Sequence, residues 1–132
     1  ENIFHIDIDD VYIGAIGTRM VADDVDYLSI LHGKLHEHIA NFHFTLGFSG
    51  NFFRRGDAAQ IQGDNILDIN ANKFHWFPHM WRHNHPPELS ADYLLALMTR
   101  NRVFDENGGI CANLSYAGSP QHSGVYPIYQ AL

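Results

Sequence analysis

Three aspartates, Asp7, Asp9 and Asp10, lie inside IFHIDIDDVYI, an apolar and β-branched segment at residues 3–13. Burying carboxylates in such a segment is costly unless they bind a cation or share protons, so we interpret these three as functional rather than structural. Successive residues of a strand point to opposite faces. Asp9 and Asp10 can therefore serve one pocket only where the strand ends and the chain turns, and the glycines that follow allow such a turn.

A pair of histidines, His79 and His83, forms the second candidate group, in the segment WFPHMWRHNHPPEL. Their spacing of i and i+4 aims two imidazoles from a single helical turn at one ion. Pro78 and Pro86 bracket the segment, and nearby aromatic rings could shield a metal from water. These rings belong to Trp76, Phe77 and Trp81. The pair is therefore a candidate pair of metal ligands.

The remaining histidines are weaker candidates. His32 and His36 have the same spacing beside the apolar stripe of a predicted helix, and we interpret them as solvated. His122 lies in SPQHSGVYP, a loop after a predicted strand, where a single histidine is usually a surface residue. The others are also interpreted as surface residues: His5, His38, His43, His75 and His85. Of these, His85 is the alternative ligand if His83 is misaligned. The chain has no His-Glu-x-x-His motif, so a zincin-type protease is not indicated.

The composition limits the kind of metal site. A single cysteine, Cys111, excludes an intrachain disulfide and a cysteine-rich zinc module, so a metal must be held by nitrogen and oxygen. The chain has ten histidines and 15 acidic residues, a mixture that suits zinc or a similar divalent ion.

Length, charge and hydropathy limit the partners. The 132 residues, 45% of them hydrophobic, are enough for one domain with a core. No apolar run of membrane-spanning length and no signal peptide is present. The net charge of −7 argues against binding to nucleic acid or to an anionic membrane. The sequence does not begin with Met, and we expect it to be part of a longer protein.

Hydrophobic periodicity predicts alternating strands and helices. Strands are expected at 3–13, 42–53, 73–77 and 110–118, and helices at 23–40, 65–73 and 90–107. This order predicts an α/β fold with a parallel sheet and right-handed crossovers. In such sheets functional residues gather at the carboxyl ends of the strands, where DIDD, PHMWRH and PQHSG all fall.

Four segments, DIDDVYIGAIGTRM, FTLGFSGNFF, FHWFPHMWRH and HSGVYP, occur in this order. Together they resemble the N-deacetylase domain of the heparan sulfate N-deacetylase/N-sulfotransferases, over nearly the whole chain. That domain is similar to the polysaccharide deacetylases, which are metal-dependent (β/α) barrels. The resemblance implies one N-deacetylase domain at 1–132 without the sulfotransferase domain. Since a complete barrel takes about 200 residues or more, we expect only part of a barrel.

By position, the resemblance implies that Asp10, His79 and His83 bind the metal. Asp9 matches the carboxylate that acts as general base, and His122 is the best match for the general acid. The chain has Gln121 where the family usually has a second histidine.

The resemblance also implies a substrate. We expect hydrolysis of the N-acetyl group of N-acetylglucosamine residues in the heparan sulfate precursor (heparosan), in the Golgi lumen, as part of a membrane-anchored parent protein. Arg54, Arg55 and Arg82 are candidates for contacting uronate carboxylates, and Trp81 for stacking on a sugar ring.

Three alternatives remain open from the residues alone. A magnesium-dependent phosphohydrolase of the haloacid-dehalogenase type would use Asp7 as nucleophile and Asp9 as acid/base, with GDNILD at 63–68 as its second acidic motif. A glycosyltransferase would use the Asp-x-Asp pattern to bind a metal-nucleotide. A non-catalytic carbohydrate-binding domain would use aromatic residues such as Trp81 and Tyr126.

Overall fold

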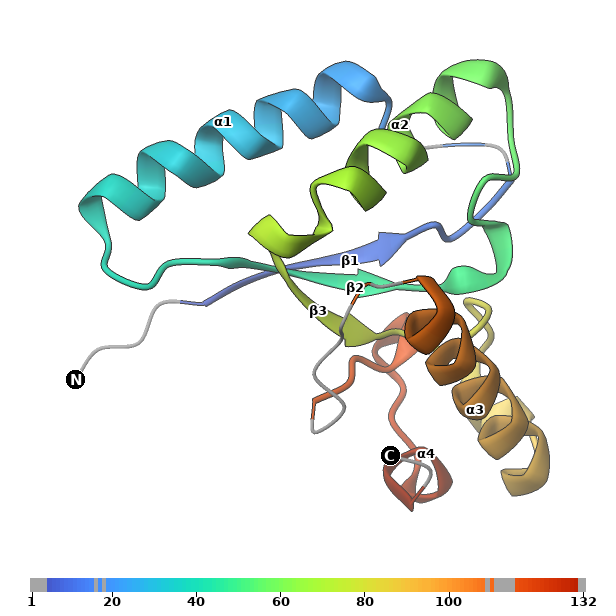
Figure 1. Ribbon diagram of the computed structural model, residues 1–132. Helices are drawn as coiled ribbons and strands as arrows, with labels where there is room; N and C mark the ends of the chain where they lie inside the picture. Colours follow the sequence, from blue (N-terminus) through green and yellow to red (C-terminus); the bar gives the residue numbers. More distant parts are fainter. Residues whose placement is uncertain (1–4, 16, 18, 109, 111–115, 131–132) are drawn as a thin grey trace.

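The computed structural model describes residues 5–15, 17, 19–108, 110 and 116–130. Three parallel strands form its sheet in the order β1 (Ile6–Val11), β2 (Phe44–Phe48) and β3 (His75–Pro78) (Figure 1). All residues of the central strand, FTLGF, are buried. On β1, by contrast, Asp7 and Asp9 are exposed and the alternating Ile6 and Ile8 are half-buried, so β1 has one polar face.

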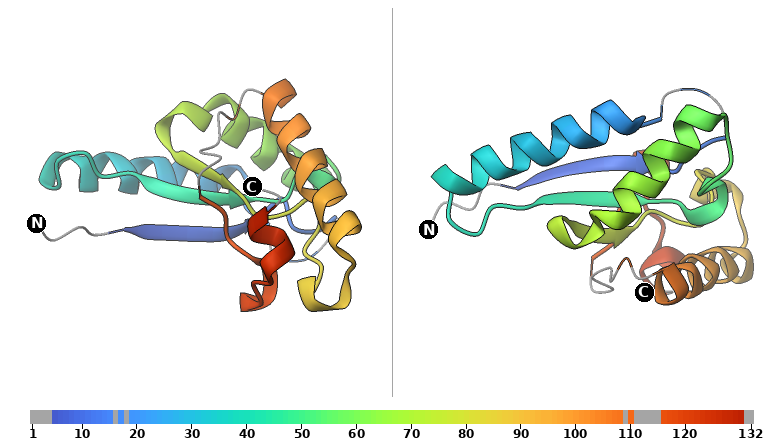
Figure 2. Two further views of the ribbon diagram at one scale, coloured as in Figure 1. Left: turned by 90° about the horizontal axis from the view of Figure 1, so that it is seen from below. Right: turned by 45° about the horizontal axis from the view of Figure 1, so that its top comes forward.

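Helices lie on both sides of this sheet. The helices α1 (Ala22–His38) and α2 (Ala58–Ile69) cover one face, and α3 (Ala91–Gly108) and the short α4 (Tyr126–Gln130) lie on the other side (Figures 1 and 2). None of the helices in the described residues is long and apolar enough to cross a membrane.

The hydrophobic core is also divided into two clusters, one on each side of the sheet. A larger cluster packs the sheet against α1 and α2, with Phe44, Leu46, Phe48 and Trp76 at its centre. A smaller cluster lies against α3 and α4, on the side of the sheet that carries the aspartates. It contains Met80, Leu94, Leu97, Met98 and Ile128.

The predicted alternation of strands and helices is confirmed up to α3, but some boundaries differ. The strand predicted at 42–53 ends at Phe48 and is followed by a short 3-10 helix at Gly50–Phe52. Helix α2 begins at Ala58, well before the expected start at residue 65. A capping box marks this start: Asp57 Oδ1 accepts from the amide of Gln60 at 2.9 Å, and Gln60 Oε1 accepts from the amide of Asp57 at 3.1 Å. The expected strand at 110–118 falls largely outside the described residues, and its described part, residues 110 and 116–118, is not in a strand.

The sheet is not closed into a barrel. In the part of the chain that the structure describes, β1 and β3 are its two edges. A closed barrel of this class needs eight tilted strands, and three strands of four to six residues form only an open, twisted sheet. The expectation of an α/β fold with a parallel sheet is therefore confirmed, and the described residues do not form a closed barrel.

His32 corrects another expectation. It is only 9% exposed and packs against the rings of Phe42, Phe44 and Phe74. The interpretation as a solvated residue was wrong, because the loop after α1 folds back and covers this side of the helix.

Candidate metal centre

The end of β1 is irregular at the two aspartates. The register with β2 shifts between Ile8 and Val11, and Asp10 adopts the left-handed conformation with φ 67°. Such a conformation is uncommon for a residue other than glycine and often marks functional sites. The bulge takes Asp10 out of strict strand alternation, so that its carboxylate reaches the residues beyond β3. This is the strand-end turn that the sequence required for Asp9 and Asp10 to serve one pocket.

The end of β3 carries the histidine pair on an irregular turn. The i, i+4 spacing is typical of a helical turn, but the segment has no helix, and Met80 has a left-handed conformation with φ 63°. Met80 is 1% exposed and anchors the turn in the smaller core cluster. The chain then reverses and brings His83 back beside His79, with ring centroids 5.7 Å apart.

Hydrogen bonds from β2 hold this turn in place. The amide of His79 donates to the carbonyl of Phe48 at 2.9 Å, and the hydroxyl of Ser49 donates to the carbonyl of His79 at 3.0 Å. The amide of Ser49 in turn donates to the carbonyl of Val11 at 2.8 Å. Asn101 on α3, which is fully buried, donates to the Phe48 carbonyl at 3.0 Å. The ends of all three strands are thus joined at one point.

Asp10, His79 and His83 meet at this point. Oδ1 of Asp10 lies 3.2 Å from Nε2 of His79 and 3.3 Å from Nε2 of His83. One ligand atom from each of the three side chains lies within 4.8 Å of the other two. Two ligands on a tetrahedral zinc ion, each about 2.0–2.2 Å from the metal, are about 3.3–3.6 Å apart. The spacing therefore fits ligands that share one ion.

The two ring nitrogens of His79 have different partners. Nδ1 lies 2.9 Å from the carbonyl oxygen of Gly118, which can only accept, so Nδ1 carries the proton and donates. Burial lowers the pKa of His79, against the opposing effect of Asp9 and Asp10, and favours a neutral ring. Nε2 then presents a lone pair to the carboxylate of Asp10. Nε2 of His79 and Oδ1 of Asp10 are then two acceptors that face each other, and this arrangement suits a cation between them.

Asp9 lies next to this group on the polar face of the sheet. A Cβ atom at Gly47 of β2 would be 3.1 Å from Oδ1 of Asp9 and 2.6 Å from Cζ of Phe77. A glycine at this position of the central strand therefore leaves room for both side chains. Asp9 is exposed and close enough for its charge to raise the pKa of His79.

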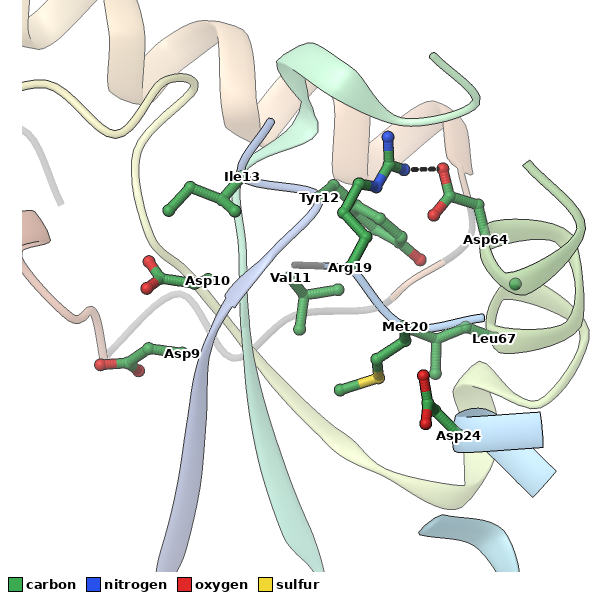
Figure 3. A pocket seen from close by; sticks show the side chains of 11 residues that line it. Asp9, Asp10, Val11, Tyr12, Ile13, Arg19, Met20, Asp24, Asp64 and Leu67 are labelled. Atoms are coloured by element: carbon green, nitrogen blue, oxygen red, sulfur yellow. Dashed lines mark hydrogen bonds and ion pairs between the residues drawn. The ribbon is translucent and has the colours of Figure 1, made fainter. Parts of the chain in front are cut away.

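A cavity of about 570 Å³ lies beside the same end of β1 and extends to α2 (Figure 3). Arg19 and Asp64 form a buried ion pair in its wall, with side chains 2% and 4% exposed. Figure 3 shows the carboxylates of Asp9 and Asp10 pointing away from this ion pair. Asp9 and Asp10 line the cavity but no histidine does, so the cavity and the metal-ligand group adjoin each other at Asp10.

Comparisons with known proteins decide the family. A family model for the heparan sulfate-N-deacetylase deacetylase domain matches residues 1–132. The chain belongs to this family. It is 46% identical, over all of its 132 residues, to bifunctional heparan sulfate N-deacetylase/N-sulfotransferase 1 of Caenorhabditis elegans, and 43% identical over 128 residues to the human protein of that name. The chain spans only 16% and 14% of the length of these relatives.

Within this deacetylase domain, His122 lies apart from the three candidate ligands. It follows Gln121 in the short 3-10 helix at Pro120–His122, and both residues have left-handed conformations with φ 54° and 55°. His122 is exposed, four residues beyond Gly118. The structure therefore places it on the segment that contacts His79, without bringing it into the ligand group.

The substrate-binding candidates have different surroundings. The guanidinium of Arg54 donates to Asn65 at 2.7 Å and to Asp68 at 2.9 Å, so it is engaged with α2. Arg55 and Arg82 are exposed. Trp81 is partly exposed, packs edge-on against Phe104, and has the guanidinium of Arg100 5.1 Å from its ring centroid.

Several residues of the site were not found by sequence reasoning. Gly118 orients His79 through a backbone carbonyl, which no residue type reveals. Ser49 and Asn101 join the strand ends, but Asn101 belongs to no recognised motif, and no role is predicted for Ser49 within FTLGFSGNFF. No sequence pattern predicts a role for Arg19, and its partner Asp64 belongs only to the acidic motif of the phosphohydrolase alternative.

Proposed function

We propose that this domain hydrolyses the N-acetyl group of N-acetylglucosamine residues in the heparan sulfate precursor. Water adds to the acetyl carbonyl, the carbon–nitrogen bond breaks, acetate leaves, and the amine that takes up a proton becomes available for N-sulfation. The observation that carries the proposal is the meeting of Asp10 with the Nε2 atoms of His79 and His83 at 3.2 and 3.3 Å. The family membership supports the choice of reaction and substrate.

A divalent ion, zinc or a similar metal, fits the donor set of two imidazoles and one carboxylate. When bound, such an ion supplies Lewis-acid activation of water and of the acetyl carbonyl. The protein contributes an oriented His79, whose Nδ1 proton is held by the Gly118 carbonyl, and a carboxylate, Asp10, that is partly open to solvent. The substrate reaches the group from the exposed side of Asp10 and His83.

Asp9 and His122 complete the proposed chemistry. Asp9 is exposed beside the ligand group and takes a proton from water as general base. His122, on the segment after Gly118, donates a proton to the glucosamine nitrogen as the bond breaks. Each of these proton transfers typically contributes about 10²- to 10⁴-fold to the rate.

The polysaccharide is proposed to run past the turn that carries His83. The exposed guanidinium of Arg82 and the partly exposed ring of Trp81 lie on this turn, and they suit uronate carboxylates and sugar rings respectively. Arg55 is a further candidate. Arg54 is a weaker one, because Asp68 and Asn65 already bind its side chain. We place the parent protein in the Golgi lumen, in keeping with its heparan sulfate substrate.

The contacts of the acidic residues do not favour the phosphohydrolase alternative. Asp7, its nucleophile, accepts a hydrogen bond from the hydroxyl of Tyr116 at 2.6 Å. The two carboxylates of its second motif, Asp64 and Asp68, are paired with Arg19 and Arg54. These partners compete with the metal and the phosphate that such an enzyme must bind.

The test measures metal content and acetate release together, with His85→Ala as the matched control for His83→Ala. His85 lies two residues away and pairs with Glu88 at 3.0 Å, outside the ligand group. We expect about one divalent ion per chain in the wild type and in His85→Ala, both releasing acetate from N-acetylated heparosan, and loss of both properties in His83→Ala.

Other outcomes would reject the proposal in different ways. Metal retained in His83→Ala would contradict the ligand assignment. Metal present without acetate release would favour the carbohydrate-binding alternative, and phosphate release from a simple phosphomonoester would favour the phosphohydrolase.

A further inference from the structure

Tyr116 is fixed at both ends of its side chain. Its hydroxyl donates to Oδ2 of Asp7 on β1 at 2.6 Å, the short distance of a hydrogen bond to a charged acceptor. Its ring packs edge-on against Phe77 on β3, with centroids 4.9 Å apart. Tyr116 thus spans the polar face of the sheet from one edge strand to the other.

The segment that begins at Tyr116 reaches the metal-ligand group within two residues. The carbonyl of Gly118 accepts the Nδ1 proton of His79 at 2.9 Å. A Cβ atom at Gly118 would be 2.7 Å from Cε2 of Phe77 and 3.1 Å from Nδ1 of His79, so this backbone lies directly on both rings. Two residues span at most about 7 Å, so fixing Tyr116 restricts where the Gly118 carbonyl can lie.

We propose that Tyr116 is a positioning residue for the metal-ligand group. Through its contacts with Asp7 and Phe77 it holds the Gly118 carbonyl against Nδ1 of His79, which keeps Nε2 directed at Asp10. The metal part of this inference rests on the proposed function. The orientation of His79 can be tested without any metal.

The chemistry of the Tyr116–Asp7 and Gly118–His79 contacts supports this role. The hydrogen bond to Asp7 and partial burial raise the pKa of Tyr116 to about 12, so the hydroxyl is protonated and donates throughout the neutral range. His79 is almost fully buried, so solvent does not readily replace the Gly118 carbonyl as a partner of Nδ1. Removing a hydrogen-bond partner that orients a metal-binding histidine through its other ring nitrogen typically changes metal affinity about 10- to 100-fold.

The test compares Tyr116→Phe with Tyr27→Phe. Both remove one hydroxyl and keep the ring, but Tyr27 is 71% exposed on α1, on the other side of the sheet. The first readout is the tautomer of His79 in the metal-free protein, measured by nitrogen-15 NMR at pH 8. We expect the proton to lie mainly on Nδ1 in the wild type and in Tyr27→Phe, and to shift in part to Nε2 in Tyr116→Phe.

The second readout is affinity for zinc, measured by competition with a chelating indicator. We expect about 10- to 100-fold weaker binding in Tyr116→Phe and in Asp7→Ala, and little further loss in the double variant, because both changes break the same contact.

An unchanged His79 tautomer in Tyr116→Phe would overturn the inference, whether or not the protein binds metal. A shifted tautomer with unchanged zinc affinity would overturn the role in metal binding. Absence of metal from the wild type and from His83→Ala would contradict the proposed function instead, and the tautomer would still decide the positioning of His79.

Discussion

Nε2 of His79 lies 3.2 Å from Oδ1 of Asp10, although His79 follows β3 and Asp10 lies near the end of β1, two strands that are not neighbours in the sheet. The strand between them, β2, has a glycine at the position that faces Asp9 and Phe77. The group therefore depends on the bulge at Asp10, the turn at Met80 and the small size of Gly47.

Replacing Gly47 with alanine is expected to disturb the site by overpacking. The new Cβ atom would be 2.6 Å from Phe77, whose ring is 1% exposed and has little room to move. We expect a loss of about 1–3 kcal/mol in the free energy of unfolding, measured with urea. Gly33→Ala is the control, because Gly33 is exposed on α1 with nothing within 4 Å of its Cβ position, and it should gain about 0.5–1 kcal/mol. Equal effects of the two substitutions would contradict the tight packing at Gly47.

Replacing Asp9 with asparagine should separate catalysis from metal binding. Because Asp9 is proposed as the general base and not as a ligand, we expect acetate release to fall about 10²- to 10⁴-fold while the metal content is unchanged. The control is Asp26→Asn on the exposed side of α1, which should leave both quantities as in the wild type. Loss of metal in Asp9→Asn would show that Asp9 is a ligand.

The Arg19–Asp64 ion pair should contribute more to stability than the exposed Arg54–Asp68 pair. Arg19→Met leaves the carboxylate of Asp64 buried without its cation, and burial already raises the pKa of that group. We expect a cost of about 3–5 kcal/mol in the free energy of unfolding. Arg54→Met removes an exposed partner and should cost less than about 1 kcal/mol. A small effect of Arg19→Met would mean that water or a rearranged side chain compensates Asp64.

The histidines near His32 should make stability depend on pH. Burial lowers the pKa of His32, and so do the charges of His43, His36, Lys73 and His75 around it. The unfolded chain, with a histidine pKa of about 6.5, therefore binds protons more readily than the folded protein. The neutral, buried form of His32 therefore contributes stability that is fully present above pH 6.5 and is lost as the pH falls below this value.

His32→Leu should make the midpoint of thermal unfolding less dependent on pH between about 7.5 and 5.5. Some dependence should remain, because the pKa of His75 is also lowered by burial. His38→Leu, at the exposed end of α1, is the matched control and should keep the pH dependence of the wild type. Identical pH profiles for the two variants would show that His32 is not responsible.

The elements of the fold could largely be predicted from the sequence. Local patterns carry this information, because the periodicity of apolar residues follows the face of each element that is buried. They include the apolar β1 segment with its aspartates, the periodic stripes of α1 and α3, and the spacing of His79 and His83. They identified the histidine pair and the three aspartates of β1, and the family resemblance singled out Asp10 among these aspartates. The start of α2 is also marked by a local signal, the capping box formed by Asp57 and Gln60.

Other features were decided only by the tertiary structure. The i, i+4 spacing suggested a helical turn at the histidine pair, whereas burial of Met80 produces an irregular turn that brings the same two rings together. The Gly118 carbonyl on His79, the Tyr116 hydroxyl on Asp7 and the partner of Arg19 join residues far apart in the chain. No periodic pattern records such contacts, because they arise when separate elements pack and each buried polar group must find a partner.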